Sequence, residues 1–318
     1  MTSPLPPWLA RQDVEAIAFE ERAAEQLTAA ARRELVAVTR RVTAEYVRRA
    51  GGVDQLLPAD QVPAFRAVLV AALAGLSIRV GDRLARIAAA GLALGLRHAA
   101  AVLGNIRLRL RPSPALRDVV AAVNERAAAD LAAAVRAART ADLERHSDVM
   151  AAVGRANQAV HRVDATTRWV ANRAVNEGIA AAADDAVAAR LWVAERDACL
   201  TCLAYAGMVV GAGELFPAGQ TFGDTSAVVG ALAGPPAHPR CRCRLSPWLS
   251  ARESADGVNL PDVLRREAQR TVLRGWSAHA SEPARLRAAD RVLRSHLLVP
   301  RSVADRARRA VAAGTFDT

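Results

Sequence analysis

The stretch Pro-Pro-Ala-His-Pro-Arg-Cys-Arg-Cys at residues 235–243, together with Cys-Leu-Thr-Cys at residues 199–202, carries the strongest chemical signal in the chain. The first stretch offers three metal ligands within six residues, and the C-x-x-C pair places two sulfurs on one side of a turn. Zinc takes four sulfur or nitrogen ligands in a tetrahedron, and two short groups brought together supply them. The sequence therefore predicts one structural zinc ion held by four of five residues: Cys199, Cys202, His238, Cys241 and Cys243.

The spacing favours particular combinations of these ligands. We expect Cys199, Cys202 and Cys241 to bind, with either Cys243 or His238 as the fourth ligand. A site closed by four protein ligands is structural, because a catalytic zinc keeps one position open for water.

The C-x-x-C pair is the first group of ligands along the chain, and residues 238–243 are the second group. From residue 240 to residue 244, arginine and cysteine alternate. If this stretch is a strand, Cys241 and Cys243 point to one face, and three arginines point to the other. These arginines are Arg240, Arg242 and Arg244. An arginine-lined strand of this kind would suit a phosphate-bearing or acidic partner.

Three other interpretations of the cysteines are open. Two disulfides would need an oxidising compartment, and the sequence shows no secretion signal. A thioredoxin-like redox pair would use Cys199 and Cys202 alone, between a strand and a helix start. The third case is a set of unrelated free thiols. All four cysteines fall within 45 of the 318 positions, and this confinement favours a joint role.

The segment around the cysteines differs in composition from its surroundings. Residues 191–195 are a predicted strand, and from there to about residue 250 glycine and proline are frequent and helical periodicity is lost. Such a segment has little core of its own. Structural zinc contributes roughly 10–16 kcal/mol of apparent folding free energy to a peptide-sized module, so it would substitute for that core.

Long helices are predicted before this segment, because it is preceded by alanine-rich sequence and alanine is the best helix former. One amphipathic helix is predicted over residues 13–49, where two glycines end it. A second is predicted over residues 60–104, with a break near Gly81. Residues 106–111 alternate arginine with apolar residues, which predicts a short strand or an extended arm.

Two further helices are predicted before the cysteines. Ser113 and Pro114 form a typical helix start, and the helical pattern continues, with or without an interruption, to about Arg155. Asp164 is a predicted N-cap for the next helix, which ends near Arg190.

Helices return after the cysteines. They are predicted to start at Pro261, at Ser281 with Pro283, and at Ser302, where Asp305 completes a capping-box-like pattern. From residue 261 to the last residue there are twelve arginines and six acidic residues. This basic helical tail is a predicted contact for DNA or for an acidic protein surface.

These patterns predict a mainly α fold: long alanine-rich helices, a small zinc-stapled α+β module and a C-terminal helical tail. The expected regions are an N-terminal helical region (1–112), a module containing the Cys/His motif at 191–247 (113–257) and basic C-terminal helices (258–318).

The chain is strongly basic, with a formal net charge of +11, and all 43 basic residues are arginine. A GC-rich genome explains the choice of arginine over lysine, whereas the charge excess itself favours an acidic partner such as DNA. The longest apolar run, at about residues 67–78, is shorter than the ~18–20 residues of a membrane span. With no targeting signal recognised, we expect a protein made in the cytoplasm.

The cysteine region resembles a known family. An aspartate two positions before C-x-x-C, a glycine-containing loop and Pro-Pro-x-His-Pro-x-Cys-Arg-Cys stand here as Asp197, Cys199, Cys202, Gly207 and residues 235–243. This pattern is similar to the head morphogenesis domain of Mu F-type minor head proteins of tailed phages. The resemblance covers about residues 115–250, including Trp192 in the predicted strand. It departs at residues 173–176, where Arg-Ala-Val-Asn stands in place of the family's Arg-Thr-Glu-like stretch.

The resemblance implies a minor capsid component inside the virion near the portal, made in the bacterial host cytoplasm and needed for head assembly and DNA packaging or delivery. It implies the portal protein and other capsid proteins as partners. The charge adds packaged DNA, bound through Arg240, Arg242, Arg244 and the C-terminal helices.

We do not expect an enzyme. The sequence has no G-x-S-x-G, H-E-x-x-H or Walker motif. The alternatives are a zinc-stabilised DNA-binding protein unrelated to virions and a zinc-containing HNH-like nuclease, for which only His238 lies in the right region.

Overall fold

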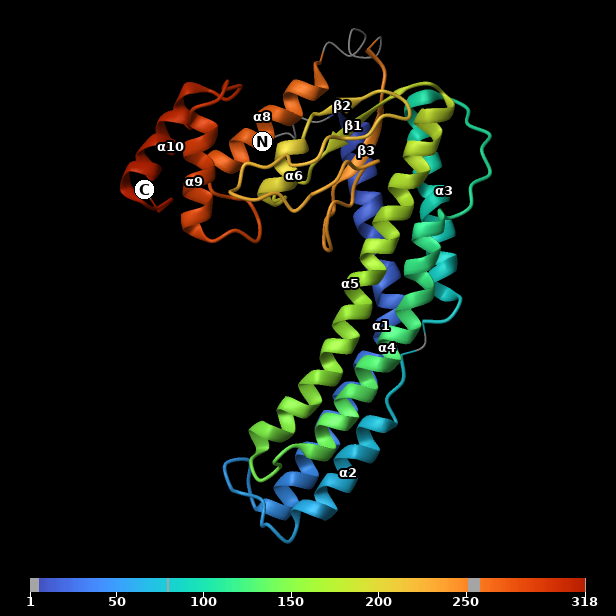
Figure 1. Ribbon diagram of the computed structural model, residues 1–318, viewed down its shortest axis with the longest axis vertical. Helices are drawn as coiled ribbons and strands as arrows, with labels where there is room; N and C mark the ends of the chain where they lie inside the picture. Colours follow the sequence, from blue (N-terminus) through green and yellow to red (C-terminus); the bar gives the residue numbers. More distant parts are fainter. Residues whose placement is uncertain (1–5, 79, 251–257, 318) are drawn as a thin grey trace. The chain divides into compact units, whose positions relative to one another are not determined.

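The computed structural model describes residues 6–78, 80–250 and 258–317. Within these ranges the protein is mainly helical, with nine helices and one three-stranded sheet, as the sequence predicts (Figure 1). The helices span Pro7–Ala50 (α1), Val62–Ala74 (α2), Arg83–Leu103 (α3), Pro114–Thr140 (α4), His146–Asp185 (α5), Leu200–Tyr205 (α6), Leu260–Leu273 (α8), Glu282–Leu293 (α9) and Arg301–Ala313 (α10). The strands span Ala189–Val193 (β1), Val209–Val210 (β2) and Arg244–Trp248 (β3).

The fold divides into two compact units, each assembled from separate stretches of chain. The sheet unit contains Met1–Phe19, Ala88–Ser113 and Ala171–Thr318, and the bundle unit contains Glu20–Ile87 and Pro114–Val170. The three continuous regions expected from the sequence stay a prediction. The end of the middle one, at residue 257, lies outside the described residues.

The bundle unit is a group of closely packed helices, α2, α4 and the parts of α1 and α5 that belong to it (Figure 1). Tyr46, about one turn before the end of α1, is fully buried and meets Phe65 edge to face, with ring centroids 5.7 Å apart. The Tyr46 hydroxyl lies 2.8 Å from Gln55 O and 2.7 Å from Glu144 O, so its polar end is satisfied inside the core. Buried alanines such as Ala138 let the helices approach closely.

Several predicted breaks and turns are confirmed. α1 ends at Ala50, directly before Gly51, whose φ of +86° suits glycine. The second predicted helix is divided into α2 and α3 around Gly81. α4 begins at Pro114. Residues 106–111 form the extended arm rather than a strand, with the arginines exposed and the apolar residues partly buried.

Two predicted helix starts are wrong. α5 runs without interruption through Asp164, whose carboxylate accepts hydrogen bonds from Arg32 (2.5 Å) and Arg168 (2.9 Å) instead of capping a helix. Alanine-rich flanks keep the backbone helical on both sides of it. α10 begins at Arg301 with Pro300 as N-cap, so Ser302 lies inside the first turn.

The sheet unit contains the antiparallel sheet, in the order β2-β1-β3. α3 and α5 cross beside it with backbones in contact. A Cβ on Gly95 would lie 2.1 Å from Val175 O, and one on Gly178 would lie 2.4 Å from Leu92 O. Only glycine fits at this crossing, which brings the buried face of α5 against β3.

The C-terminal helices α8, α9 and α10 form a small group around buried alanines such as Ala289 and Ala307. Leu200 and Leu203 of α6 belong to the same apolar cluster. The short helix that carries the first cysteine pair is therefore supported by the C-terminal helices.

One helix in the described ranges, α3, is long and apolar enough to cross a membrane by length and composition alone. Half of its most apolar window is buried inside the protein. A core helix passes the same test, so this is weak evidence for a membrane segment.

Candidate metal centre

The first cysteine pair lies at the start of α6. Cys199 is the N-cap residue, with extended backbone angles, and Cys202 follows one turn later. Residues three apart on a helix share one side, so both sulfurs face the same way. Cys202 is buried, and Cys199 is partly exposed.

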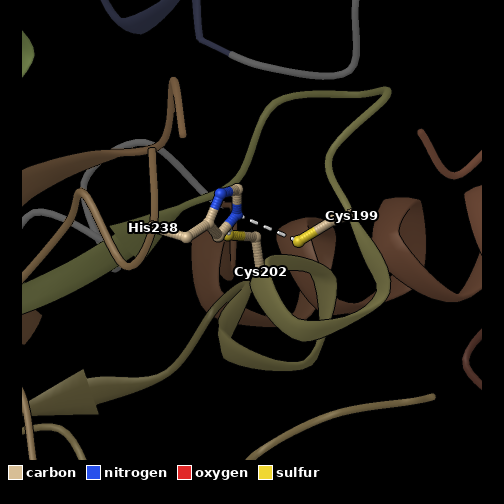
Figure 2. Close-up of side chains that lie close together, drawn as sticks. All are labelled: Cys199, Cys202 and His238. Atoms are coloured by element: carbon tan, nitrogen blue, oxygen red, sulfur yellow. Dashed lines mark hydrogen bonds between the residues drawn. The ribbon is translucent and has the colours of Figure 1, made fainter. Parts of the chain in front are cut away.

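His238 approaches this pair from the second group (Figure 2). Its Nε2 lies 3.1 Å from Cys199 Sγ and 3.2 Å from Cys202 Sγ. Its Nδ1 lies 2.7 Å from Pro239 O, to which it donates a hydrogen bond. When the ring is neutral, this bond leaves the lone pair on Nε2, the atom directed at the sulfurs, which is the usual arrangement of a metal-binding histidine.

Cys241 and Cys243 complete the cluster, and both are buried. Cys241 Sγ lies 3.6 Å from Cys202 Sγ. The ligand atoms form two overlapping groups, Cys199–Cys202–His238 and Cys202–Cys241–Cys243, each with all atoms within 4.8 Å of one another. The structure thus brings together all five predicted ligands and makes Cys202 the residue common to both groups.

These distances suit a tetrahedral metal ion. Zn–S bonds of about 2.3 Å and Zn–N bonds of about 2.0–2.1 Å imply about 3.8 Å between two sulfurs and about 3.6 Å between sulfur and nitrogen. The 3.6 Å separation of Cys202 and Cys241 and the 3.1–3.2 Å separations from His238 are close to these values. The residues present therefore fit a metal ion, and sulfur-rich ligation favours a soft or borderline one.

The electrostatics of the cluster agree with this fit. The hydrogen bond from Cys202 lowers the pKa of Cys199 to about 4. The hydrogen bond to Cys199 raises the pKa of His238 to about 9. Hydrogen bonds to the other three sulfurs, Cys199 first, raise the pKa of Cys202. Crowded thiols in a buried site cannot all ionise without a cation, and a bound metal ion would replace the shared protons.

The loop before β3 is held from α5 by two buried asparagines. Asn176 Nδ2 donates to Cys243 O (3.2 Å), and Asn176 Oδ1 accepts from Leu245 N (2.7 Å). Asn172 Nδ2 also donates to Cys243 O (3.4 Å). In extended backbone the C=O of one residue and the N–H two residues later point to the same edge, so the Asn176 amide takes the place of a neighbouring strand.

Sequence reasoning missed these asparagines. The available signal was a pair of amides four residues apart on an otherwise apolar helix face, which includes Val175. Amides buried at such positions need partners, and here the partner is the metal loop.

The prediction that Cys241 and Cys243 lie in a strand is wrong. β3 begins at Arg244, and both cysteines lie in the loop before it. The loop turns at Arg240, which has a φ of +66°, and Cys241 N donates to His238 O at 3.1 Å. This turn, rather than strand alternation, directs the second group toward the first.

The three arginines of this segment have different environments. Arg240 and Arg242 are exposed, and Arg242 donates to both carboxylate oxygens of Asp197 at 2.8 and 2.9 Å. Arg244 is buried and pairs with Asp13 (2.8 Å) and Glu195 (2.9 Å). The prediction that Arg244 faces a DNA partner is therefore wrong, because two carboxylates hold it inside the protein.

An aromatic layer adjoins the cluster. Trp192 stacks on Tyr205 with ring centroids 4.7 Å apart and meets Phe216 edge to face at 5.2 Å. These rings share one apolar core with Cys202, Cys241 and Cys243. This core shields Cys202, Cys241 and Cys243 from solvent, whereas Cys199 and His238 stay partly exposed.

No protein-family model, curated protein or solved structure matches this chain. Its interpretation therefore depends on its own residues.

Proposed function

We propose that the chain is a minor capsid protein that acts in head morphogenesis of a tailed phage or prophage, stabilised by a structural zinc ion. The supporting observation is the meeting of both halves of the Mu F-like pattern. Cys199 and His238 are 39 positions apart in the sequence, yet their side chains lie 3.1 Å apart. The ion pair of Asp197 with Arg242 joins the same two halves. A chance match of short motifs would not require these residues to meet.

Zinc is the metal proposed for the centre. Four thiols and one imidazole suit zinc, and carboxylate or water ligands are not needed. The ion would be held by Cys202 with three of Cys199, His238, Cys241 and Cys243. The metal ion would stabilise the fold by linking α6 to the loop before β3. These two segments are a helix and a loop, so strand pairing does not link them.

The capsid role follows from the resemblance. In this proposal the protein is made in the bacterial host cytoplasm and resides inside the virion near the portal. Its partners are the portal protein and other capsid proteins. Packaged DNA would be contacted through Arg240, Arg242 and the basic C-terminal helices, and such binding would weaken as salt rises.

The proposed role is not enzymatic. His238 is directed at the thiols, so it is assigned as a ligand rather than as a base. Among the other histidines, His98 is buried against Glu15, and His146 lies against the Tyr46 ring. His146 Nε2 also lies 3.3 Å from Thr43 Oγ1, so these two side chains are assigned as a hydrogen-bonded pair between α1 and α5.

The test is quantitative mass spectrometry of purified, nuclease-treated particles from an induced culture of the source strain. The expected result is this chain at a low, fixed ratio to the major capsid protein and a constant ratio to the portal protein across preparations. A host cytosolic protein serves as the contamination control. Absence of the chain from particles that contain portal and packaged DNA would refute the virion role.

A second candidate is a zinc-stabilised DNA-binding protein unrelated to virions, and the net charge of +11 favours it. Tight, sequence-selective binding of duplex DNA by the isolated full chain would support this candidate over the capsid role.

A further inference from the structure

Trp276 is an unusual aromatic residue in this protein. Every tryptophan, tyrosine and phenylalanine of the chain lies in the described ranges, and Trp276 alone among them is exposed, at 51%. Leaving a large aromatic side chain in water forgoes the stabilisation that burial provides. An aromatic residue kept at the surface in this way is typical of a binding anchor.

The backbone holds Trp276 rigidly at the end of α8. Gly275 N donates to Val272 O, and Trp276 N donates to Thr271 O, both at 3.0 Å. This pattern is the Schellman motif, and Gly275 has the φ of +67° that it requires. Arg285 of α9 donates from Nη1 to Gly275 O at 2.7 Å, and this hydrogen bond stabilises the turn. The indole is therefore presented on a pre-organised turn.

One arginine lies over the indole, and two others lie close enough to that arginine to act on it electrostatically. The guanidinium carbon of Arg274 lies 4.7 Å from the ring centroid, so one ring face is covered by a cation. Partial burial and the nearby charges of Arg270 and Arg306 lower the pKa of Arg274. Glu267 is the acidic group that acts on Arg274, and it already pairs with Arg270 at 3.3 Å. In the described part of the chain, Arg274 makes no ion pair, and the buried Arg270 Nε has no acceptor.

We propose that Trp276, Arg274, Arg270 and Arg306 form a binding site for single-stranded nucleic acid, in which a base stacks on the indole and the arginines bind the adjacent phosphates. A flat base suits the exposed part of the indole, and each base is joined to a phosphate that suits the guanidiniums. An acidic peptide would neutralise the charges but would leave the ring face unused. Bases in a duplex are stacked on one another and are unavailable to the indole.

The proposal rests on neither the metal centre nor the capsid role, so its failure would leave both unaffected. The test is fluorescence anisotropy of the full chain with a labelled oligothymidylate of about 20 nucleotides, longer than the ~4–16 nucleotides of typical single-strand sites. A duplex of the same length is the competitor. Far-UV circular dichroism checks that each variant is folded.

Trp276→Ala should weaken binding roughly 5- to 150-fold, the range expected when one stacked base loses its platform. Trp276→Phe should bind within about threefold of wild type, because phenylalanine keeps the π face. Arg274→Gln should reduce the slope of log affinity against log salt by about 0.7, the value for one phosphate of a single strand. Arg117→Gln, which removes an exposed arginine from α4, is the matched charge control and should change neither quantity.

Photocrosslinking of wild-type protein to an oligonucleotide containing 5-iododeoxyuridine gives a readout that needs no variant. The expected crosslinked peptide contains Trp276. Three results would overturn the proposal: unchanged affinity in Trp276→Ala, equal affinity for duplex and single strand, or crosslinks confined to other parts of the chain.

Discussion

Replacing Asn176 with leucine would detach the metal loop from α5 without changing a ligand. The two side chains have the same number and branching of heavy atoms, so the substitution removes the hydrogen bonds and keeps a similar side-chain shape. Leu245 N would lose its 2.7 Å acceptor, and Cys243 O would keep only the longer 3.4 Å bond from Asn172 among the bonds described above.

The cost follows from these two backbone groups. A buried donor left without an acceptor costs about 1–3 kcal/mol, and the weakened bond to Cys243 O adds about 1 kcal/mol. We therefore expect Asn176→Leu to lower the free energy of unfolding by about 2–4 kcal/mol. Because the loop carries the candidate ligands His238, Cys241 and Cys243, zinc affinity should also fall by about 10–100-fold, as for other groups that orient metal ligands.

The assay is urea unfolding of the zinc-loaded protein, with zinc affinity measured by chelator competition. Asn157→Leu is the matched control, because Asn157 lies on the same helix and is exposed. Its effect should stay within about 0.5 kcal/mol. Equal behaviour of the two variants, or unchanged zinc affinity in Asn176→Leu, would refute the positioning role of the amide.

Three further predictions concern the metal ligands, a buried histidine and a buried arginine. Cys202→Ser should abolish stoichiometric metal binding and Cys199→Ser should weaken it less, because Cys202 belongs to both ligand groups; metal titration of the two variants checks this order. Burial lowers the pKa of His98, so its contribution to stability is present above the model-peptide value of 6.5 and is lost as pH falls below it. The free energy of unfolding of wild type should therefore fall relative to His98→Gln on acidification through that value, and a pH-independent difference would contradict this. Arg244→Ala should cost about 3–5 kcal/mol because it leaves two partly buried carboxylates without their partner, whereas Arg242→Ala should cost at most about 1 kcal/mol in urea unfolding.

Local patterns in the sequence predicted much of the fold. The double glycine after α1 and the Ser113–Pro114 pair mark real helix boundaries, because glycine and proline act on the backbone where they stand. Asp164 failed as a marker because a side chain that can cap a helix can equally well bind an arginine from another helix. Capping is a local preference, and a tertiary ion pair overrides it.

The residues of the candidate metal site could also be predicted from the sequence, but the contacts that hold them in place could not. Five ligand residues in two tight groups were evident from spacing alone, and the structure brings them together. The asparagines on α5 and the burial of Arg244 depend on contacts between residues far apart in the sequence. Arg244 and Asp13, for example, are 231 positions apart. Alternation within a six-residue stretch carries no information about such partners.

The most direct test of the central claim is the metal content of the reduced, folded full chain, purified without a metal-binding tag. Native mass spectrometry and elemental analysis should find one zinc ion per chain, and X-ray absorption should find a mainly sulfur first shell at about 2.3 Å. Metal content near zero in protein that is folded and reduced would contradict the claim that these cysteines and His238 form a metal centre.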